Sequence, residues 1–135
     1  MINTKDYDFS FSGLKTAVLY AWRKEPASAG SSGVARMAAE VQQAIIDVLI
    51  KKTMKAVKDF NAKSLILGGG VSANQELHKQ FLQTPGVCNG DINFFAPKPA
   101  LSTDNSLMTA ITGFYHKKET KPWQKIEADG NLRIE

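Results

Sequence analysis

The sequence contains few of the residues that build disulfides and protein metal sites. Cys88 is its one cysteine, and His78 and His116 are its two histidines, in 135 residues. A single cysteine excludes an internal disulfide and a zinc site made of several cysteines, and it favours a reducing compartment. The two histidines lie far apart, each in a predicted helix, where isolated histidines are surface residues more often than metal ligands. No serine, histidine and acid pattern typical of a hydrolytic triad stands out.

Long apolar stretches are absent as well. No run approaches the roughly 18 apolar residues that a membrane-spanning helix needs, and the polar start, Met1 to Asp6, lacks the apolar core of a signal peptide. We therefore expect a soluble, cytoplasmic protein that contacts no membrane. The length and the 43% share of hydrophobic residues fit one domain with one core. There is no internal repeat or low-complexity segment.

The charge balance is mildly basic, with a formal net charge of +4 and a pI near 9.2. Such an excess suits contact with a polyanion such as RNA, but it is as common in proteins that bind none. Four lysines gather in the C-terminal half of one predicted helix: Lys51, Lys52, Lys55 and Lys58. Cations are stabilised there by the helix dipole, so a solvated face explains them more simply than an RNA-binding patch.

Apolar residues spaced three or four apart predict four helices. They start near residues 14, 34, 74 and 104, and the second, over residues 34–60, is the longest. The third is expected to bury Leu77 and Phe81. The fourth extends to about residue 116 and has Ser102 or Thr103 available as its N-cap.

Two short apolar runs predict strands. One covers Ser64 to Leu67 and should be buried; the other covers Ile92 to Phe95 and is stopped by Pro97, which cannot donate to a ladder. Asp8 to Gly13 alternates aromatic and hydroxyl residues, as a half-buried strand or turn does. Strands that alternate with helices indicate an α/β fold.

Two segments should lie outside the core. Residues 26–33 are small and polar and indicate a loop, in which Ser31 or Ser32 can cap the next helix. Residues 119–135 form an exposed tail, with a possible hairpin at Asp129-Gly130.

The most informative stretch is the glycine turn, Gly68, Gly69 and Gly70, between the first strand and the following helix. Glycines allow a positive φ and let a ligand come close. A helix that starts near Ser72 would point its free N–H groups and positive dipole end at the same place. The pattern therefore predicts a site for a phosphate or carboxylate, and the alternative is a tight connection without a ligand.

Two known nucleotide-binding motifs can be compared with this turn. Gly68, Gly70 and Ala73 match the dinucleotide fingerprint G-x-G-x-x-G/A, so an NADP-dependent oxidoreductase has to be considered. That fold expects an acid at the end of the next strand, whereas here the strand runs into proline and lysine, and Asp91 lies at its other end. A P-loop is excluded because no Lys-Ser or Lys-Thr pair follows the glycines.

Asp104 marks a second candidate position, in the sequence Ser102-Thr103-Asp104-Asn105. A carboxylate there opens a helix just past a strand end, where open α/β sheets bind ligands. It is a candidate metal ligand, and the alternative is that it only stabilises the positive end of the helix. A catalytic metal needs about three protein ligands, so one carboxylate leaves the set incomplete.

Three segments in this order resemble one family: DFSFSGLKT at residues 8–16, GGGVSAN at residues 68–74 and STDN at residues 102–105. It is the tRNA N6-adenosine threonylcarbamoyltransferase family, TsaD, formerly called glycoproteases, and the resemblance covers residues 7–118. It implies an actin-like, Hsp70-like, sugar-kinase-like ATPase fold of two lobes. Residues 1–135 would then be a single partial domain, the C-terminal lobe, without the N-terminal lobe.

The resemblance also implies roles for the candidate residues. Asn74 and the three glycines would contact an adenine nucleotide, threonylcarbamoyl-AMP, and Asp104 would bind one divalent metal ion, iron or zinc-like. The family's other metal ligands are two histidines in a His-x-x-x-His motif of its N-terminal half, which this sequence lacks. The metal would therefore be shared with the missing lobe, and no catalytic residue is assignable here.

The implied reaction transfers threonylcarbamoyl from threonylcarbamoyl-AMP to N6 of adenosine 37 of tRNA, which makes t6A. The implied partners are tRNA and the proteins of the transfer complex. We expect the chain alone to be inactive, and to self-associate through surfaces that the missing lobe would cover. Three alternatives stay open: a non-catalytic nucleotide-binding or scaffold paralogue, an NADP-dependent oxidoreductase, and a sugar kinase. The old peptidase label gains no support from these residues.

Overall fold

The structure is a computed structural model that describes residues 2–24, 30–119, 121–125 and 127. Residues 26–29 of the expected loop and the expected hairpin at Asp129-Gly130 lie outside this part. Within the described residues, no helix combines the length and the apolar character that crossing a bilayer requires.

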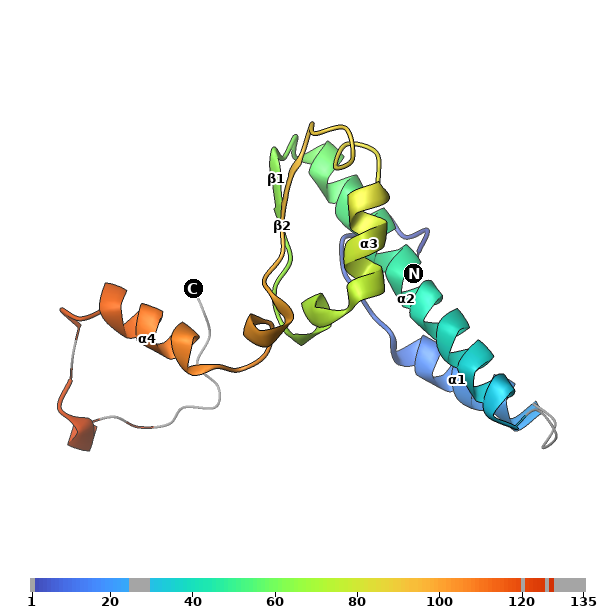
Figure 1. Ribbon diagram of the computed structural model, residues 1–135, viewed down its shortest axis with the longest axis horizontal. Helices are drawn as coiled ribbons and strands as arrows, with labels where there is room; N and C mark the ends of the chain where they lie inside the picture. The colour runs from blue at the N-terminus through green and yellow to red at the C-terminus, as the bar shows by residue number, and fades with distance from the viewer. Residues whose placement is uncertain (1, 25–29, 120, 126, 128–135) are drawn as a thin grey trace.

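Helices dominate a small α/β arrangement (Figure 1). The α-helices are α1 (Ser12–Lys24), α2 (Gly30–Asp59), α3 (Gln75–Gln83) and α4 (Ser106–Tyr115), and the strands are β1 (Ser64–Ile66) and β2 (Asn93–Phe95). Single 3-10 turns, η2 (Gly70–Ala73), η3 (Pro99–Leu101) and η4 (Trp123–Lys125), join or follow them. Helices α1 and α2 lie side by side, α3 packs against α2, and α4 stands apart from both (Figure 1).

Helix α2 confirms the predicted long amphipathic helix and extends it at its start. It begins at Gly30, so Ser31 and Ser32 lie inside its first turn. Their predicted role as caps after a loop is therefore wrong. Ile46 and Val48 are the apolar side chains of α2 that are buried. Ile46 packs against α3 and the sheet, whereas Val48 lies on the side of α2 that faces Phe11 and Leu14.

The unit β1–α3–β2 forms the core with α2. The strands are parallel, with Leu65 opposite Phe94. Buried Leu77 and Phe81 of α3 pack with Ile46, which confirms their predicted inward direction, and the rings of Phe81 and Phe94 stack at 5.5 Å. Helix α3 therefore covers one face of the two-stranded sheet.

The opposite face of the sheet is open. Ile66 and Phe95, paired across the strands, are 74% and 56% exposed. The prediction that the first strand is buried was therefore wrong. Because successive residues of a strand point to opposite faces, burying both faces needs a layer on each side, and the described residues supply a helix on one side only.

Helix α4 begins two residues later than predicted and has a different cap. The side chain of Asn105 accepts a hydrogen bond from the Met108 amide at 3.1 Å, whereas Ser102 is buried and donates to the carbonyl of Lys98 at 3.3 Å. Ser102 is the C-cap of the preceding 3-10 turn and its hydroxyl is already hydrogen-bonded there, so Asn105 takes the capping position of α4. The apolar residues of α4 are exposed: Leu107, Met108, Ile111 and Phe114.

The N-terminal segment also differs from expectation. Residues 7–11 form no strand, because the described residues offer them no neighbouring strand to pair with, and Phe9 is 48% exposed. Residues 3–8 instead lie against the C-terminal half of α2, where Lys52 is buried. The lysines of α2 are thus not simply a solvated face.

Candidate functional site

The glycine turn joins β1 to η2, and all three glycines are exposed. Gly69 has φ 77° and ψ 176°, a conformation that side chains other than glycine rarely adopt. Ser72 holds the turn from its buried side. It is 2% exposed, and its hydroxyl donates to the carbonyl of Gly69 at 2.7 Å. His78 of α3 holds the same turn, because its Nε2–H donates to the carbonyl of Ser72.

The space above the turn is open. A Cβ built at Gly68, Gly69 or Gly70 would meet no atom of another residue within 4 Å. The positive φ explains the glycine at position 69. Neither a positive φ nor a close neighbour explains the glycines at positions 68 and 70. Among the residues that the structure describes, the turn therefore presents bare backbone with no neighbour above it.

The helix after the turn starts later than predicted. A 3-10 turn occupies residues 70–73, and α3 begins only at Gln75. Its N-cap is Asn74, whose Oδ1 accepts from the Leu77 amide at 3.0 Å. The prediction of an α-helix dipole aimed at the glycines from Ser72 is thus wrong, because α3 begins three residues later and its N-cap Asn74 takes the amide of Leu77.

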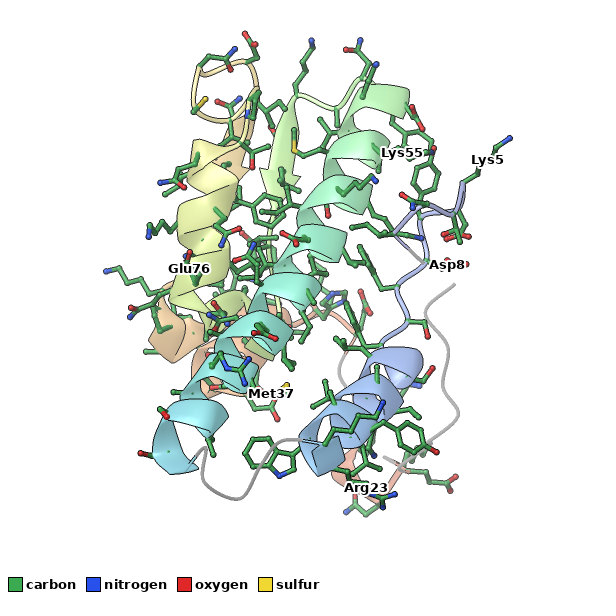
Figure 2. All side chains as sticks on the ribbon, turned by 90° about the vertical axis from the view of Figure 1, so that its right-hand side faces the viewer. Lys5, Asp8, Arg23, Met37, Lys55 and Glu76 are labelled. Carbon is green, nitrogen blue, oxygen red and sulfur yellow. The ribbon has the colours of Figure 1, made fainter. Side chains whose placement is uncertain are left out.

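An apolar groove of about 730 Å³ borders the turn. Gly70, Val71 and Asn74 line one side. The other lining residues come from α1, α2 and α3: Val18, Trp22, Val34, Met37, Ala38, Val41, Gln42, Ile45, Ile46, Leu49 and Leu77. Met37 lies on the side of α2 that faces α1 (Figure 2). The amides of Asn74 and Gln42, which share a 3.0 Å hydrogen bond, give this apolar groove a polar rim.

Asp104 is exposed and lies between η3 and α4. Since η3 packs beside η2, the segment that carries Asp104 starts next to the glycine turn. The predicted metal ligand and the predicted turn are thus brought to the same side of the fold, and no interaction joins Asp104 to the glycines among the described residues.

The described residues do not make a metal centre by themselves. They contain no group of three His, Cys, Asp or Glu side chains placed to hold an ion. His78 is engaged with the glycine turn, and Nδ1 of His116 donates to Glu119 at 3.0 Å at the end of α4. Asp104 therefore stands without further ligands in this part of the chain.

Sequence reasoning missed Gln42, Ser72 and His78 as supports of the site. Gln42 meets Asn74 across 32 residues, a relation that no local pattern reveals. His78 was set aside as an isolated histidine, yet it lies four residues after the cap Asn74, one helical turn away from the glycine turn. That spacing was the available signal.

These features define an α/β protein with an open glycine turn at the end of a strand, beside an apolar groove. The chain belongs to the tRNA N6-adenosine threonylcarbamoyltransferase family, TsaD, whose sequence profile matches residues 1–111. This confirms the family expected from the three motifs.

Three relatives illustrate the similarity, each described as a tRNA N6-adenosine threonylcarbamoyltransferase. The protein from Thermosipho africanus is 39% identical over 99% of this chain and 40% of its own length. The one from Desulfotalea psychrophila is 44% identical over 82% of the chain and 32% of its own length. The protein from Syntrophomonas wolfei is 38% identical over 85% of the chain and 33% of its own length. The chain thus spans between about a third and two fifths of these relatives.

Proposed function

We propose that this chain supplies the nucleotide-facing glycine turn of a tRNA threonylcarbamoyltransferase. The observation that carries the proposal is the bare backbone at Gly68 and Gly70, where neither the backbone conformation nor packing against the described residues requires glycine. A ligand that approaches the backbone closely does require it. The family supports threonylcarbamoyl-AMP as that ligand.

The geometry suits the two ends of an adenine nucleotide. The phosphate group would lie over the backbone N–H groups of Gly68 to Gly70, which are exposed. The flat purine would enter the groove between α1 and α2, whose lining is mostly apolar. Asn74 would contact the nucleotide from the rim, where its side chain already bridges to Gln42.

The metal of this family is proposed to involve Asp104. It would be one ligand of a divalent ion, iron or zinc-like, and residues outside this chain would supply the others, since the described residues do not complete a set. The chain would then form the C-terminal part of a two-lobed, actin-like ATPase fold, a single partial domain over residues 1–135. The chain would act together with the N-terminal lobe of that fold, with tRNA and with the protein partners of the transfer complex.

The first experiment is calorimetric titration of the 135-residue chain with AMP. We expect binding to the wild-type chain and its loss in Gly68→Val, whose side chain would fill the space over the turn. The matched control is Gly113→Val in α4, because a Cβ there also meets no neighbour within 4 Å. Equal binding by both variants would contradict the proposed site, and binding of NADP without AMP would favour an oxidoreductase.

The second experiment tests the reaction. The chain is co-expressed with the segment of the Thermosipho africanus relative that this chain does not match, and t6A in tRNA is measured by mass spectrometry. We expect t6A with the wild-type chain and none with Asp104→Asn. If both parts fold and associate but form no t6A, the transfer activity is rejected and a scaffold paralogue is favoured.

A further inference from the structure

Lys52 of α2 is a buried cation with an unusual set of partners. Only 2% of its surface is exposed, and its ammonium contacts four oxygen atoms. They are Thr4 Oγ1 at 2.9 Å, Asp6 Oδ1 at 2.5 Å, the Asp6 carbonyl at 3.2 Å and the Asp8 carbonyl at 2.7 Å. All four belong to one short stretch at the start of the chain. A buried ammonium is tolerated only when it is paired and hydrogen-bonded in this way.

Neighbouring turns of α2 hold the same stretch, residues 3–8, which we call the strap. Lys51 donates to the side chain of Asn3 at 2.9 Å. The hydroxyl of Tyr7 donates to Asp59 at 2.8 Å, and the ammonium of Lys55 lies 4.2 Å from the centre of the Tyr7 ring. Figure 2 shows the strap running along the C-terminal half of α2 and then entering α1.

Helix α1 depends on this attachment because its own packing is weak. None of its residues is buried, and it begins at Ser12, only four residues after the Asp8 carbonyl that Lys52 holds. Val18 and Trp22 of α1 nevertheless form one wall of the groove beside the glycine turn. The position of that wall is therefore fixed from the strap more than from contacts of α1 itself.

We propose that Lys52 is a positioning residue that fastens the strap to α2 and so sets α1 as a wall of the groove. Two of its four partners are backbone carbonyls, so it fixes the path of the main chain and not only a side chain. The expected effect of Lys52 on nucleotide affinity rests on the proposed function. Its expected effect on the position of α1 is independent of that function.

Hydrogen exchange tests the structural part. In Lys52→Met, which keeps an unbranched apolar stem but lacks the ammonium, amides of α1 should exchange about tenfold faster, while amides of α3 stay protected. The matched control is Lys58→Met, a change at an exposed lysine of the same helix. Unchanged exchange in α1 of Lys52→Met would overturn the proposal.

A second variant covers the possibility that Lys52→Met unfolds the chain. Lys52→Met combined with Asp6→Asn removes the two charges together, so neither a buried ammonium nor a carboxylate is left unpaired. The tryptophan emission of Trp22 then reports on α1, in a Trp123→Phe background that leaves one tryptophan. We expect a red shift from greater solvent exposure. No shift, together with unchanged exchange in α1, overturns the proposal.

Titration with AMP tests the link to the groove. If α1 is a wall of the binding site, the double variant should raise the dissociation constant about tenfold and Lys58→Met should leave it unchanged. Faster amide exchange in α1 with an unchanged dissociation constant for AMP would overturn the proposed link between α1 and the groove. If the wild-type chain binds no AMP, the proposed function fails, and the exchange experiment still decides the role of Lys52.

Discussion

Asn74 and Gln42 meet through their side-chain amides: the Nδ2 of Asn74 donates to Oε1 of Gln42 at 3.0 Å, across 32 residues of sequence. The Oδ1 of the same Asn74 accepts from the Leu77 amide and caps α3. One side chain thus joins α2 to the start of α3 directly beside the glycine turn. The two hydrogen bonds are separable by mutation.

Replacing Asn74 tests which of its two hydrogen bonds stabilises the chain. Asn74→Ala removes the cap and should lower the free energy of unfolding by about 1 kcal/mol. Asn74→Asp retains the capping oxygen but cannot donate to Gln42, so we expect it to stay close to the wild type. Urea denaturation followed by circular dichroism measures both. A loss in Asn74→Asp as large as in Asn74→Ala would assign the stability to the amide bridge instead.

Two of the glycines in the turn, Gly68 and Gly69, should respond differently to alanine. Gly69→Ala forces a side chain into a positive φ with an extended ψ, a conformation almost confined to glycine, and should cost about 1–3 kcal/mol. Gly68→Ala meets neither strain nor a neighbour within 4 Å, so its free energy of unfolding should change by less than about 0.5 kcal/mol. Chemical denaturation of the two variants makes the comparison. Similar losses in both would show that the turn adopts another conformation in solution.

The strap should weaken in acid. The hydrogen bond from Lys52, aided by that from Thr4, lowers the pKa of Asp6 below its ordinary value of 3.8. A lowered carboxyl pKa adds stability that is fully present above that ordinary value and is lost as the pH falls through the folded-state pKa. The stability difference between the wild type and Asp6→Asn should therefore shrink below about pH 4. Denaturation curves at several pH values measure it, and a difference that grows in acid would contradict the assignment.

The chain should self-associate through its uncovered apolar surfaces. Ile111 and Phe114 of α4 are 47% and 66% exposed, and exposed apolar patches favour association. Ile111→Lys should shift light scattering towards the monomer, whereas Thr109→Lys on the same helix serves as the control for added charge. A monomeric wild-type chain at high concentration would rule out this prediction.

Helices were the part of the fold best predicted from the sequence, because their apolar spacing is a local signal. Leu77 and Phe81, four residues apart, marked the inner face of α3 correctly. The caps were predicted less well. Asn105 and Ser102 are both good caps, and the hydrogen bond of Ser102 to the carbonyl of Lys98, at the end of a 3-10 turn, decides between them.

The sequence predicted the glycine turn of the candidate site but not the side chains that hold the turn in place. The three glycines predicted the turn, but the hydrogen bonds of Ser72 and His78 depend on the position of the turn and of α3 in the folded chain. Lys52 was misjudged for a similar reason: its partners lie more than 40 residues away. A signal did exist, since Lys52 follows buried Val48 by four residues and therefore occupies the apolar stripe of α2.

The burial of Lys52 sets a limit on how far the chain can be shortened from its start. The motif that begins at Asp8 looks like a natural boundary in the sequence, but three of the four oxygen partners of the ammonium lie before it and the fourth is the carbonyl of Asp8 itself. A version that started at Phe9 would lose the counter-charge of the ammonium together with the residues that cover it, so Lys52 would return to solvent. Those few polar residues therefore decide whether a shortened chain still holds the start of α1 against α2.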